Sequence, residues 1–189
     1  GNTASATGLN NHGFGYSALP HATGGGASSC TLYNCTLRSN SASASLSNSR
    51  ISSTTGIDAS GGGAFFCKVY NCTLSGNSAS ADGRGNLYRL GSYARGGGAY
   101  GGTLNNCTLV GNTTTATYDH AGYGGYYTGG GAYNGGPNNC IIYFNSYSLH
   151  EIGRPENWFE DNISTGGRSY CWTTDPLFVD TNGWSNLRL

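Results

Sequence analysis

The 189-residue chain contains no methionine, only four prolines and few charges. Nine basic and nine acidic residues make up 10% of the chain and give a formal net charge of zero. A neutral chain lacks the basic face that a sequence-independent nucleic-acid binder needs. No hydrophobic run approaches the roughly 20 residues of a membrane helix, and no signal peptide opens the chain. We therefore expect neither nucleic-acid binding nor membrane insertion.

Helix and disorder are also poorly supported. Gly, Ser, Thr and Asn recur too often for long amphipathic helices. Disordered chains combine high net charge with few aromatics, whereas 12% of this chain is aromatic, including 14 tyrosines. The missing methionine predicts a processed or excised piece of a longer array. Glycine, at 33 positions, is abundant, and the composition favours an all-β chain.

A repeat accounts for many of the glycines. Four segments align without gaps, each opening on a triple glycine and closing on an asparagine sixteen residues later. Short alternating runs on either side of an Asn, as in CKVYNCTL (Cys67–Leu74), predict strand, corner and strand. Such units cannot bury an apolar face alone, but they can when they stack. The four segments are Gly24–Asn40, Gly61–Asn77, Gly96–Asn112 and Gly129–Asn145.

The repeat predicts an all-β fold, a right-handed parallel β-helix (β-solenoid) with loop insertions. Equivalent residues would then form ladders along the axis, with the Asn ladder at a corner where stacked amides bond to each other. The expected ladders are Cys35, Cys72, Cys107 and Cys140; Leu37, Leu74, Leu109 and Ile142; and Asn40, Asn77, Asn112 and Asn145.

We expect a single β-helix domain over 1–189. Its repeats are placed at about 24–60, 61–95, 96–128 and 129–145, followed by an insertion at 146–169 and a final coil at 170–189. Between the aligned segments, each variable insert is expected to supply a third strand and an exposed excursion. A helical turn is expected near Glu156–Phe159 within the insertion.

The variable segments are rich in tyrosine, which offers a large amphipathic contact area at low entropic cost. Their aromatic side chains either pack over the solenoid flank or contact a partner. The residues proposed for contact are Tyr88, Tyr93, Tyr118, Tyr123, Tyr126, Tyr127 and Trp158.

The seven cysteines have no CxxC-type spacing, so no metal site is predicted. Cys30 and Cys67 form a second, shorter ladder. Stacked cysteines could reach disulfide distance, but their side chains would run parallel. Cysteine is also a small hydrophobe suited to a narrow core. We favour mostly reduced ladder cysteines, with one or two disulfides as the alternative.

Polysaccharide hydrolases and lyases need clustered carboxylates or a basic residue on one face. Asp58, Asp82 and Asp119 occupy no common repeat position, so no catalytic site is predicted. No calcium-binding motif is present either. The sequence therefore predicts no catalytic residue, cofactor or metal.

The pairing of a GGA motif with a hydrophobic-x-x-Asn element resembles the repeats of the polymorphic outer-membrane proteins. It occurs first as Gly25-Gly26-Ala27 with Leu37-Arg38-Ser39-Asn40, although that family favours Phe where this chain has Leu or Ile. Asp175–Leu189 is similar to the segment that precedes the anchor in bacterial surface β-helices. The resemblance implies a right-handed β-helix on a bacterial surface.

The main expectation is an extracellular or cell-surface structural module that assembles head-to-tail with copies of itself into a fibre. The alternative is an adhesin that binds glycans through Tyr- and Trp-rich loops. A polysaccharide-active enzyme ranks third.

Overall fold

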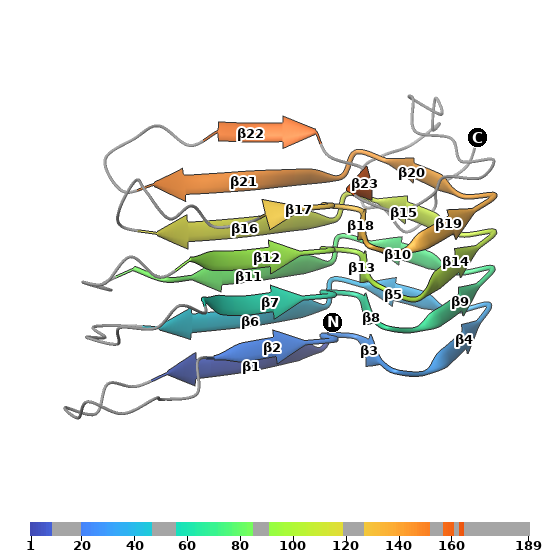
Figure 1. The fold of residues 1–189 in the computed structure, drawn as a ribbon. Helices are drawn as coiled ribbons and strands as arrows, with labels where there is room; N and C mark the ends of the chain where they lie inside the picture. The colour runs from blue at the N-terminus through green and yellow to red at the C-terminus, as the bar shows by residue number, and fades with distance from the viewer. Residues whose placement is uncertain are drawn as a thin grey trace.

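The computed structural model describes residues 1–8, 20–46, 56–84, 91–118, 127–151, 157–160 and 163–164. Within these ranges all regular structure is β-strand, with no helix. Each strand from β6 to β21 pairs in parallel with the strand five places earlier in the chain (Figure 1). This is the arrangement of a β-solenoid. The predicted all-β parallel β-helix is therefore confirmed.

Strands β1 to β20 pass in turn through five sheets, here named A to E, after which β21 and β22 add to sheet A and β23 adds to sheet C. Sheet A contains β1 (Thr3–Gly8), β6 (Ser41–Leu46), β11 (Ser78–Asp82), β16 (Thr113–Tyr118), β21 (Ser146–Glu151) and β22 (Asn157–Glu160). Sheet B contains β2 (His21–Thr23), β7 (Ile57–Ser60), β12 (Ser92–Arg95) and β17 (Tyr127–Thr128).

Sheets C, D and E are built from shorter strands. Sheet C contains β3 (Ala27–Ser28), β8 (Ala64–Phe65), β13 (Ala99–Tyr100), β18 (Ala132–Tyr133) and β23 (Ile163–Ser164). Sheet D contains β4 (Thr31–Tyr33), β9 (Lys68–Tyr70), β14 (Thr103–Asn105) and β19 (Gly136–Asn138). Sheet E contains β5 (Thr36–Arg38), β10 (Thr73–Ser75), β15 (Thr108–Val110) and β20 (Ile141–Tyr143).

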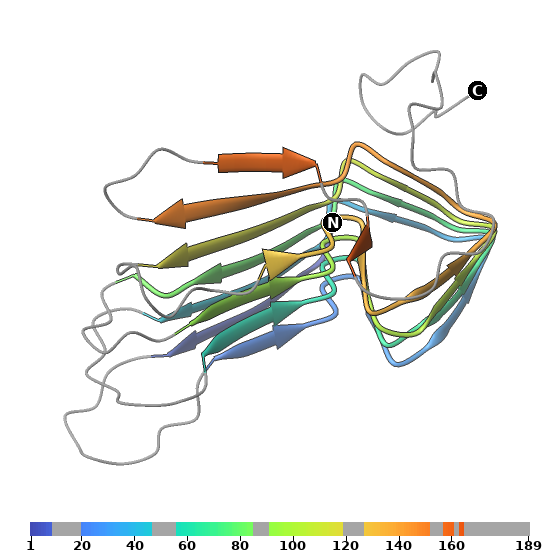
Figure 2. The same cartoon turned by 45° about the horizontal axis from the view of Figure 1, so that its top comes forward.

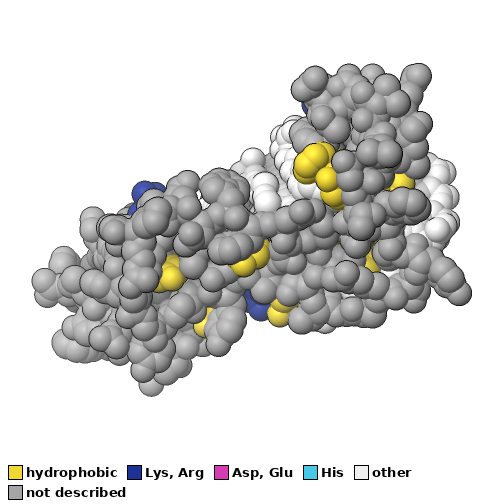
Figure 3. All heavy atoms as spheres, turned by 90° about the horizontal axis from the view of Figure 1, so that it is seen from above, with side chains coloured by type: hydrophobic (Ala, Val, Ile, Leu, Met, Phe, Trp, Pro, Cys, Tyr) yellow, Lys and Arg dark blue, Asp and Glu magenta, His cyan; other side chains and the backbone are white. Residues whose placement is uncertain are grey.

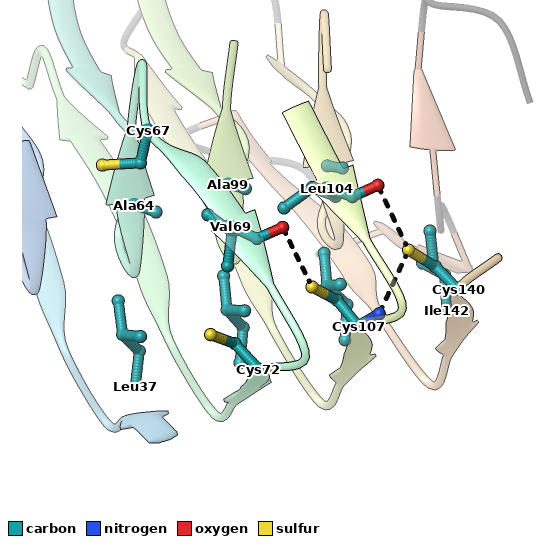
Figure 4. Close-up of a cluster of buried hydrophobic side chains, with 13 residues drawn as sticks. Leu37, Ala64, Cys67, Val69, Cys72, Ala99, Leu104, Cys107, Cys140 and Ile142 are labelled. Carbon is teal, nitrogen blue, oxygen red and sulfur yellow. Dashed lines mark hydrogen bonds between the residues drawn. The ribbon is translucent and has the colours of Figure 1, made fainter. Parts of the chain in front are cut away.

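The five sheets form two regions. Sheets A and B run alongside each other as two long layers, which we call the flat region, whereas sheets C, D and E enclose a triangle, the triangular region (Figure 2). The core of the flat region is mostly alanine, with Leu46 and Ile57 among the larger members. Leucine, valine, isoleucine and cysteine fill the triangular region (Figure 4).

Alternation in the sequence decides which side chains enter the flat core. In β6, Ala42, Ala44 and Leu46 are buried and the intervening serines are half-buried. Successive side chains of a strand point to opposite faces, so this pattern turns every second residue inward. Alanine at the inward positions lets the two layers approach closely.

Different constraints require glycine at the first position of the triple glycine and at the other two. Gly61 has φ +65°, in the left-handed region that favours glycine. A Cβ on Gly62 would lie 2.1 Å from the carbonyl oxygen of Ser78, and one on Gly63 would lie 2.5 Å from that of Gly98. The chain therefore needs glycine for conformation at the first position and for space at the other two.

Asparagine marks the corner between sheets D and E, as the strand–corner–strand pattern predicted. Asn71 lies between β9 and β10 with φ 52°, and Asn34, Asn106 and Asn139 are equivalent. Asparagine tolerates this left-handed conformation better than most residues.

The variable inserts differ from the expectation of one additional strand each. The insert after Asn40 supplies two strands, β6 and β7, which belong to sheets A and B. The next insert supplies β11 and β12 in the same way. A flat double layer is therefore present where a single strand was expected.

The segment expected to be an insertion, 146–169, also begins as regular solenoid. Strand β21 pairs in parallel with β16, so Ser146 faces Thr113 and Leu149 faces Ala116. The expected helical turn near Glu156–Phe159 is wrong, because Asn157–Glu160 is strand β22, antiparallel to β21. Strand pairing supplies these backbone groups with partners that an isolated helical turn would lack. The expected final coil, 170–189, lies outside the described residues.

Candidate functional site: ladders and exposed aromatics

The buried asparagine ladder connects successive coils at the corner between sheets E and A. The Nδ2 group of Asn40 donates to Oδ1 of Asn77 at 2.9 Å, and Asn77 donates in the same way to Asn112 at 2.9 Å. Asn112 donates to Asn145 at 2.8 Å. The backbone N–H of Asn40, Asn77 and Asn112 also donates to the next Oδ1 in the row. The predicted Asn ladder is present.

These amides are nearly inaccessible, so each hydrogen bond matters for stability. Asn77, Asn112 and Asn145 are fully buried, and their Nδ2 groups also donate to the carbonyls of Leu37, Leu74 and Leu109. A buried polar group left without a partner costs about 1–3 kcal/mol. The row extends to the first coil, where the N–H of Asn2 donates to Oδ1 of Asn40 at 2.8 Å.

The second predicted ladder, Leu37, Leu74, Leu109 and Ile142, runs along sheet E. Leu74 faces Leu37 on one side and Leu109 on the other, and Leu109 faces Ile142. All four side chains are buried in the triangular core.

The third row, Cys35, Cys72, Cys107 and Cys140, is built from free thiols. Each thiol donates to a carbonyl two residues earlier, for example Cys72 to Tyr70 at 3.1 Å and Cys140 to Asn138 at 3.2 Å. The shared orientation gives Cys107 and Cys140 a further carbonyl acceptor on the preceding coil (Figure 4).

Two members of this row have shifted acidity. The hydrogen bond with Cys140 lowers the pKa of the Cys107 thiol to about 7, against the opposing effect of burial. Burial raises the pKa of the Cys72 thiol. Because Cys72, Cys107 and Cys140 are 2% exposed, reagents in solution have little access to them.

An unpredicted row of aromatic rings lies on the outer side of sheet C. The rings of Phe65 and Tyr100 stack with centroids 5.2 Å apart, and those of Tyr100 and Tyr133 with centroids 5.4 Å apart. Phe66 meets Phe65 edge-on at 4.8 Å. An aromatic pair contributes roughly 0.5–1.5 kcal/mol beyond its buried area. The signal in the sequence was the aromatic residue directly after GGA in three of the four repeats.

Arg95, on sheet B, lies over this aromatic row. Its guanidinium carbon is 5.5 Å from the ring centroids of Tyr93 and Tyr100 and 5.9 Å from that of Tyr133. The guanidinium also pairs with the carboxylate of Asp58, which accepts a hydrogen bond from Ser60 at 2.5 Å. Aromatic faces attract cations, so Arg95 holds the edges of sheets B and C together.

Two exposed phenylalanines occupy strained corners. Phe66 has φ 49° and Phe144 has φ 53°, where the equivalent residues of other coils are Ser, Gly or Asn. The left-handed conformation costs a residue with a side chain roughly 1–2 kcal/mol. Phe66 is nevertheless 52% exposed and Phe144 46% exposed, so both place apolar surface in solvent at a conformational cost.

Two of the tyrosines predicted to lie in exposed contact loops lie in strands instead. Tyr118 ends strand β16 and is 8% exposed, so its assignment to an exposed contact loop is wrong. Tyr93 lies in strand β12, not in a loop, and is half-buried beneath Arg95.

The remaining contact candidates are placed only in part. Tyr127 lies in β17 and faces Ala94, a buried position of sheet B, so the backbone again contradicts a loop. Trp158 lies in strand β22 and faces Ser148, so it too belongs to a strand. Tyr88, Tyr123 and Tyr126 fall outside the described residues. Sequence periodicity missed these strands because glycine and tyrosine obscure the alternation.

The outer side of sheet A is lined by hydroxyls. Every second residue of β1, β6 and β16 is Ser or Thr, and those of β11 and β21 begin the same way. Some of these hydroxyls bond between coils, as Ser78 does to Ser41 at 3.2 Å and Ser148 to Thr115 at 3.4 Å. The result is a hydroxyl-rich face that repeats from coil to coil, and Asp82 of β11 is a charged residue on it.

The first coil leaves one end of the solenoid uncovered in the described part of the chain. Strands β1, β2, β3, β4 and β5 each form an edge of their sheet. Leu32 and Cys35 are only partly buried in this coil, whereas their equivalents Val69 and Cys72 are buried. At the other end, β22 covers the edge of sheet A; Figure 3 views the molecule from this end, and hydrophobic side chains are among the few described ones visible there.

Ionisable groups with described side chains do not gather into a site. Asp58 pairs with Arg95, and Asp82 pairs with Arg84. Groups of three or more potential metal ligands are absent from this part of the chain. Among the same residues, no helix is long and apolar enough to span a membrane.

Comparison with known proteins finds no family model that matches the chain, and no curated protein or solved structure matches it either. The likeness to polymorphic outer-membrane-protein repeats therefore remains one of motif, and the comparisons add no support for an anchor segment.

Proposed function

We propose that this chain is a structural segment of an extracellular β-solenoid fibre, which lengthens when a second copy docks against the first coil. The observation that carries the proposal is that, among the described residues, each of the five sheets ends on a strand of the same coil, β1–β5. Unpaired strand edges are templates for the addition of further strands. The motif likeness to bacterial surface repeats supports the extracellular location.

The backbone of β1 is suited to such addition. Ser41 donates to the carbonyl of Asn2 at 2.9 Å, and the N–H of Asn2 is also directed to the second coil. Neighbouring residues of a parallel strand direct their backbone groups to opposite sides. The N–H and C=O groups of Thr3, Ser5 and Thr7 therefore point away from β6, toward an incoming strand.

The side chains of the first coil fit the same partner. Ala27, Leu32 and Cys35 border the triangular core without the cover that their equivalents have in later coils. A docked coil would bury them as the second coil buries Leu37, at roughly 25 cal/mol for each Å² of apolar surface. In a head-to-tail contact, β1 of one copy would pair with β22 of the next, because β22 forms the last edge of sheet A.

The test is Ser5→Pro, which removes one outward N–H and leaves the bonds from β1 to β6 in place. Proline on an edge strand blocks further pairing. We expect fibres of the unaltered chain in negative-stain electron microscopy and a sedimentation coefficient that rises with concentration. Ser5→Pro should sediment as a monomer, whereas Ser5→Ala should assemble like the unaltered chain.

Circular dichroism should show that all three proteins retain β-structure. A monomeric unaltered chain at every concentration would refute the proposal, as would Ser5→Pro fibres formed as readily as those of Ser5→Ala.

A second candidate function is adhesion to a glycan or another surface, as the tyrosine-rich segments suggested. The supporting observation is the exposed pair Phe66 and Phe144, held in strained corners. The stacked rings of Phe65, Tyr100 and Tyr133 cover one another's faces, which makes this row a poor platform for sugar rings. Phe66→Ser, which copies Ser29 of the first coil, should lower binding on a glycan array if adhesion is the function.

A further inference from the structure

Cys30 and Cys67 stack directly before strands β4 and β9 of sheet D, and their sulfur atoms lie close together. The two Sγ atoms are 3.5 Å apart. The adjoining residues Thr31 and Lys68 are direct partners in sheet D, and the backbone N–H of Lys68 donates to the carbonyl of Cys30 at 2.9 Å. Adjacent strands lie about 4.8 Å apart, within the Cα separation of roughly 4.4–6.8 Å that a disulfide spans.

The cysteines of the longer row bond to backbone groups. Cys35 and Cys72 each donate to a carbonyl of their own coil, at 3.1 Å in both cases, and Cys72 Sγ accepts from the backbone N–H of Cys35. Cys107 and Cys140 repeat this arrangement. Cys67 also donates to a carbonyl of its own coil, that of Phe65 at 3.4 Å, so the pair Cys30 and Cys67 is distinguished by its sulfur–sulfur contact together with the exposure of Cys30.

Accessibility separates the two groups further. Cys30 is exposed, because it belongs to the first coil, whereas Cys67 is buried behind it. Glycines occupy the equivalent positions of the next two coils, Gly102 and Gly135, so this row has two members. A Cβ on Gly102 would lie 2.0 Å from the carbonyl oxygen of Cys67.

We propose that Cys30 and Cys67 are a redox-sensitive pair that forms a disulfide between the first and second coils. The co-reactant is a small-molecule disulfide such as oxidised glutathione. The inference does not depend on fibre formation.

The reaction proceeds by two exchanges. Cys30 loses its proton, and its thiolate attacks one sulfur of the small disulfide, which releases one small thiolate and leaves a mixed disulfide on Cys30. Cys67 then loses its proton and attacks the Cys30 sulfur, which releases the second small thiolate. The two protons pass to the released thiolates. The protein loses two electrons, and one small disulfide becomes two thiols.

Partial desolvation and the hydrogen bond to Cys67 raise the pKa of the Cys30 thiol. Because the thiolate is the attacking species, the first exchange should accelerate as the pH rises from 7 to 9. The second exchange starts from sulfurs already near attacking distance.

The experiment incubates the folded chain with oxidised glutathione, blocks the remaining thiols and maps the peptides by mass spectrometry without reduction. We expect a peptide pair linked through Cys30 and Cys67, two hydrogens lighter than the separate peptides, and two fewer free thiols. Cys35→Ser is the matched control and should form the same link. Cys30→Ser and Cys67→Ser should not form it.

A second measurement uses the stability of the oxidised chain. A link that closes a loop of this length should raise the melting temperature by about 5–10 °C, and a reductant should reverse the shift. Glutathione that stays attached to Cys30, a link from Cys30 to any other cysteine, including Cys171, or an unchanged thiol count would each overturn the proposal.

Discussion

The flat and triangular regions belong to the same coils, yet they are stabilised in different ways. The triangular region packs leucine, valine and cysteine around a short perimeter, and it repeats without gaps from coil to coil. The flat region packs two layers on alanine, and the connections between its strands vary in length. The comparison shows that large core side chains tie three sheets to one register, whereas alanine holds two layers at a short distance.

The largest effect is expected at the corner that joins the two regions. The substitution Asn77→Ala removes the acceptor for two donors of Asn40, its backbone N–H and its Nδ2 group. It also removes the donor to the Leu37 carbonyl. Leaving these groups unsatisfied should lower the free energy of unfolding by about 4 kcal/mol. Asn105 accepts a hydrogen bond from the side chain of Asn138 on the exposed side of sheet D, so Asn105→Ala should cost less than about 1 kcal/mol in the same urea titration. Equal losses would mean that the buried ladder has no special role.

A cavity in the triangular region should have the next largest effect. Leu74 is fully buried between Leu37 and Leu109, so Leu74→Ala should lower the free energy of unfolding by about 3 kcal/mol. Leu32→Ala, in the partly exposed first coil, should cost about a third as much. Urea denaturation of both variants measures the difference.

Added volume, in contrast, should be the sensitive change in the flat region. Ala81 is fully buried between the two layers, so Ala81→Val should destabilise the chain by about 2 kcal/mol through overpacking. Ser80→Val, on the outer side of the same strand, should change stability by no more than about 0.5 kcal/mol. If both variants melt at the temperature of the unaltered chain, alanine does not set the layer spacing.

The smallest predicted effect is a gain in stability. Thr114 interrupts the alanine row of sheet A, and its buried hydroxyl has no hydrogen-bond partner among the described groups. Thr114→Val keeps the shape and removes this hydroxyl, which should add about 1 kcal/mol to the free energy of unfolding. Thr115→Val, with its side chain on the outer face, should give no comparable gain.

Sequence reasoning predicted the repeated parts well and the variable parts poorly. Four in-register copies placed Asn77 above Asn40 and Leu74 above Leu37, because residues at the same position of an aligned segment must stack when coils stack. No such constraint applied to the segments between copies. The sequence therefore predicted one strand where the structure has β6 and β7, and it predicted that Tyr118 lies in an exposed contact loop.

The candidate contact surfaces show the same division. The aromatic residues after GGA were visible in the sequence, but their stacking and the position of Arg95 depend on how sheet B meets sheet C. The strain at Phe66 was equally hidden, because φ at a corner follows from the path of the whole coil.

The sequence by itself determined that this chain forms a parallel β-solenoid whose axial rows are asparagine, leucine and cysteine, since four segments that align without gaps repeat each environment. It also determined where glycine is required, because the triple glycine recurs in every copy. Only the tertiary structure decided that the inserts form a flat double layer, that β22 turns back along β21, and that Cys30 faces Cys67. These features depend on contacts between segments that share no period, and packing in three dimensions specifies such contacts.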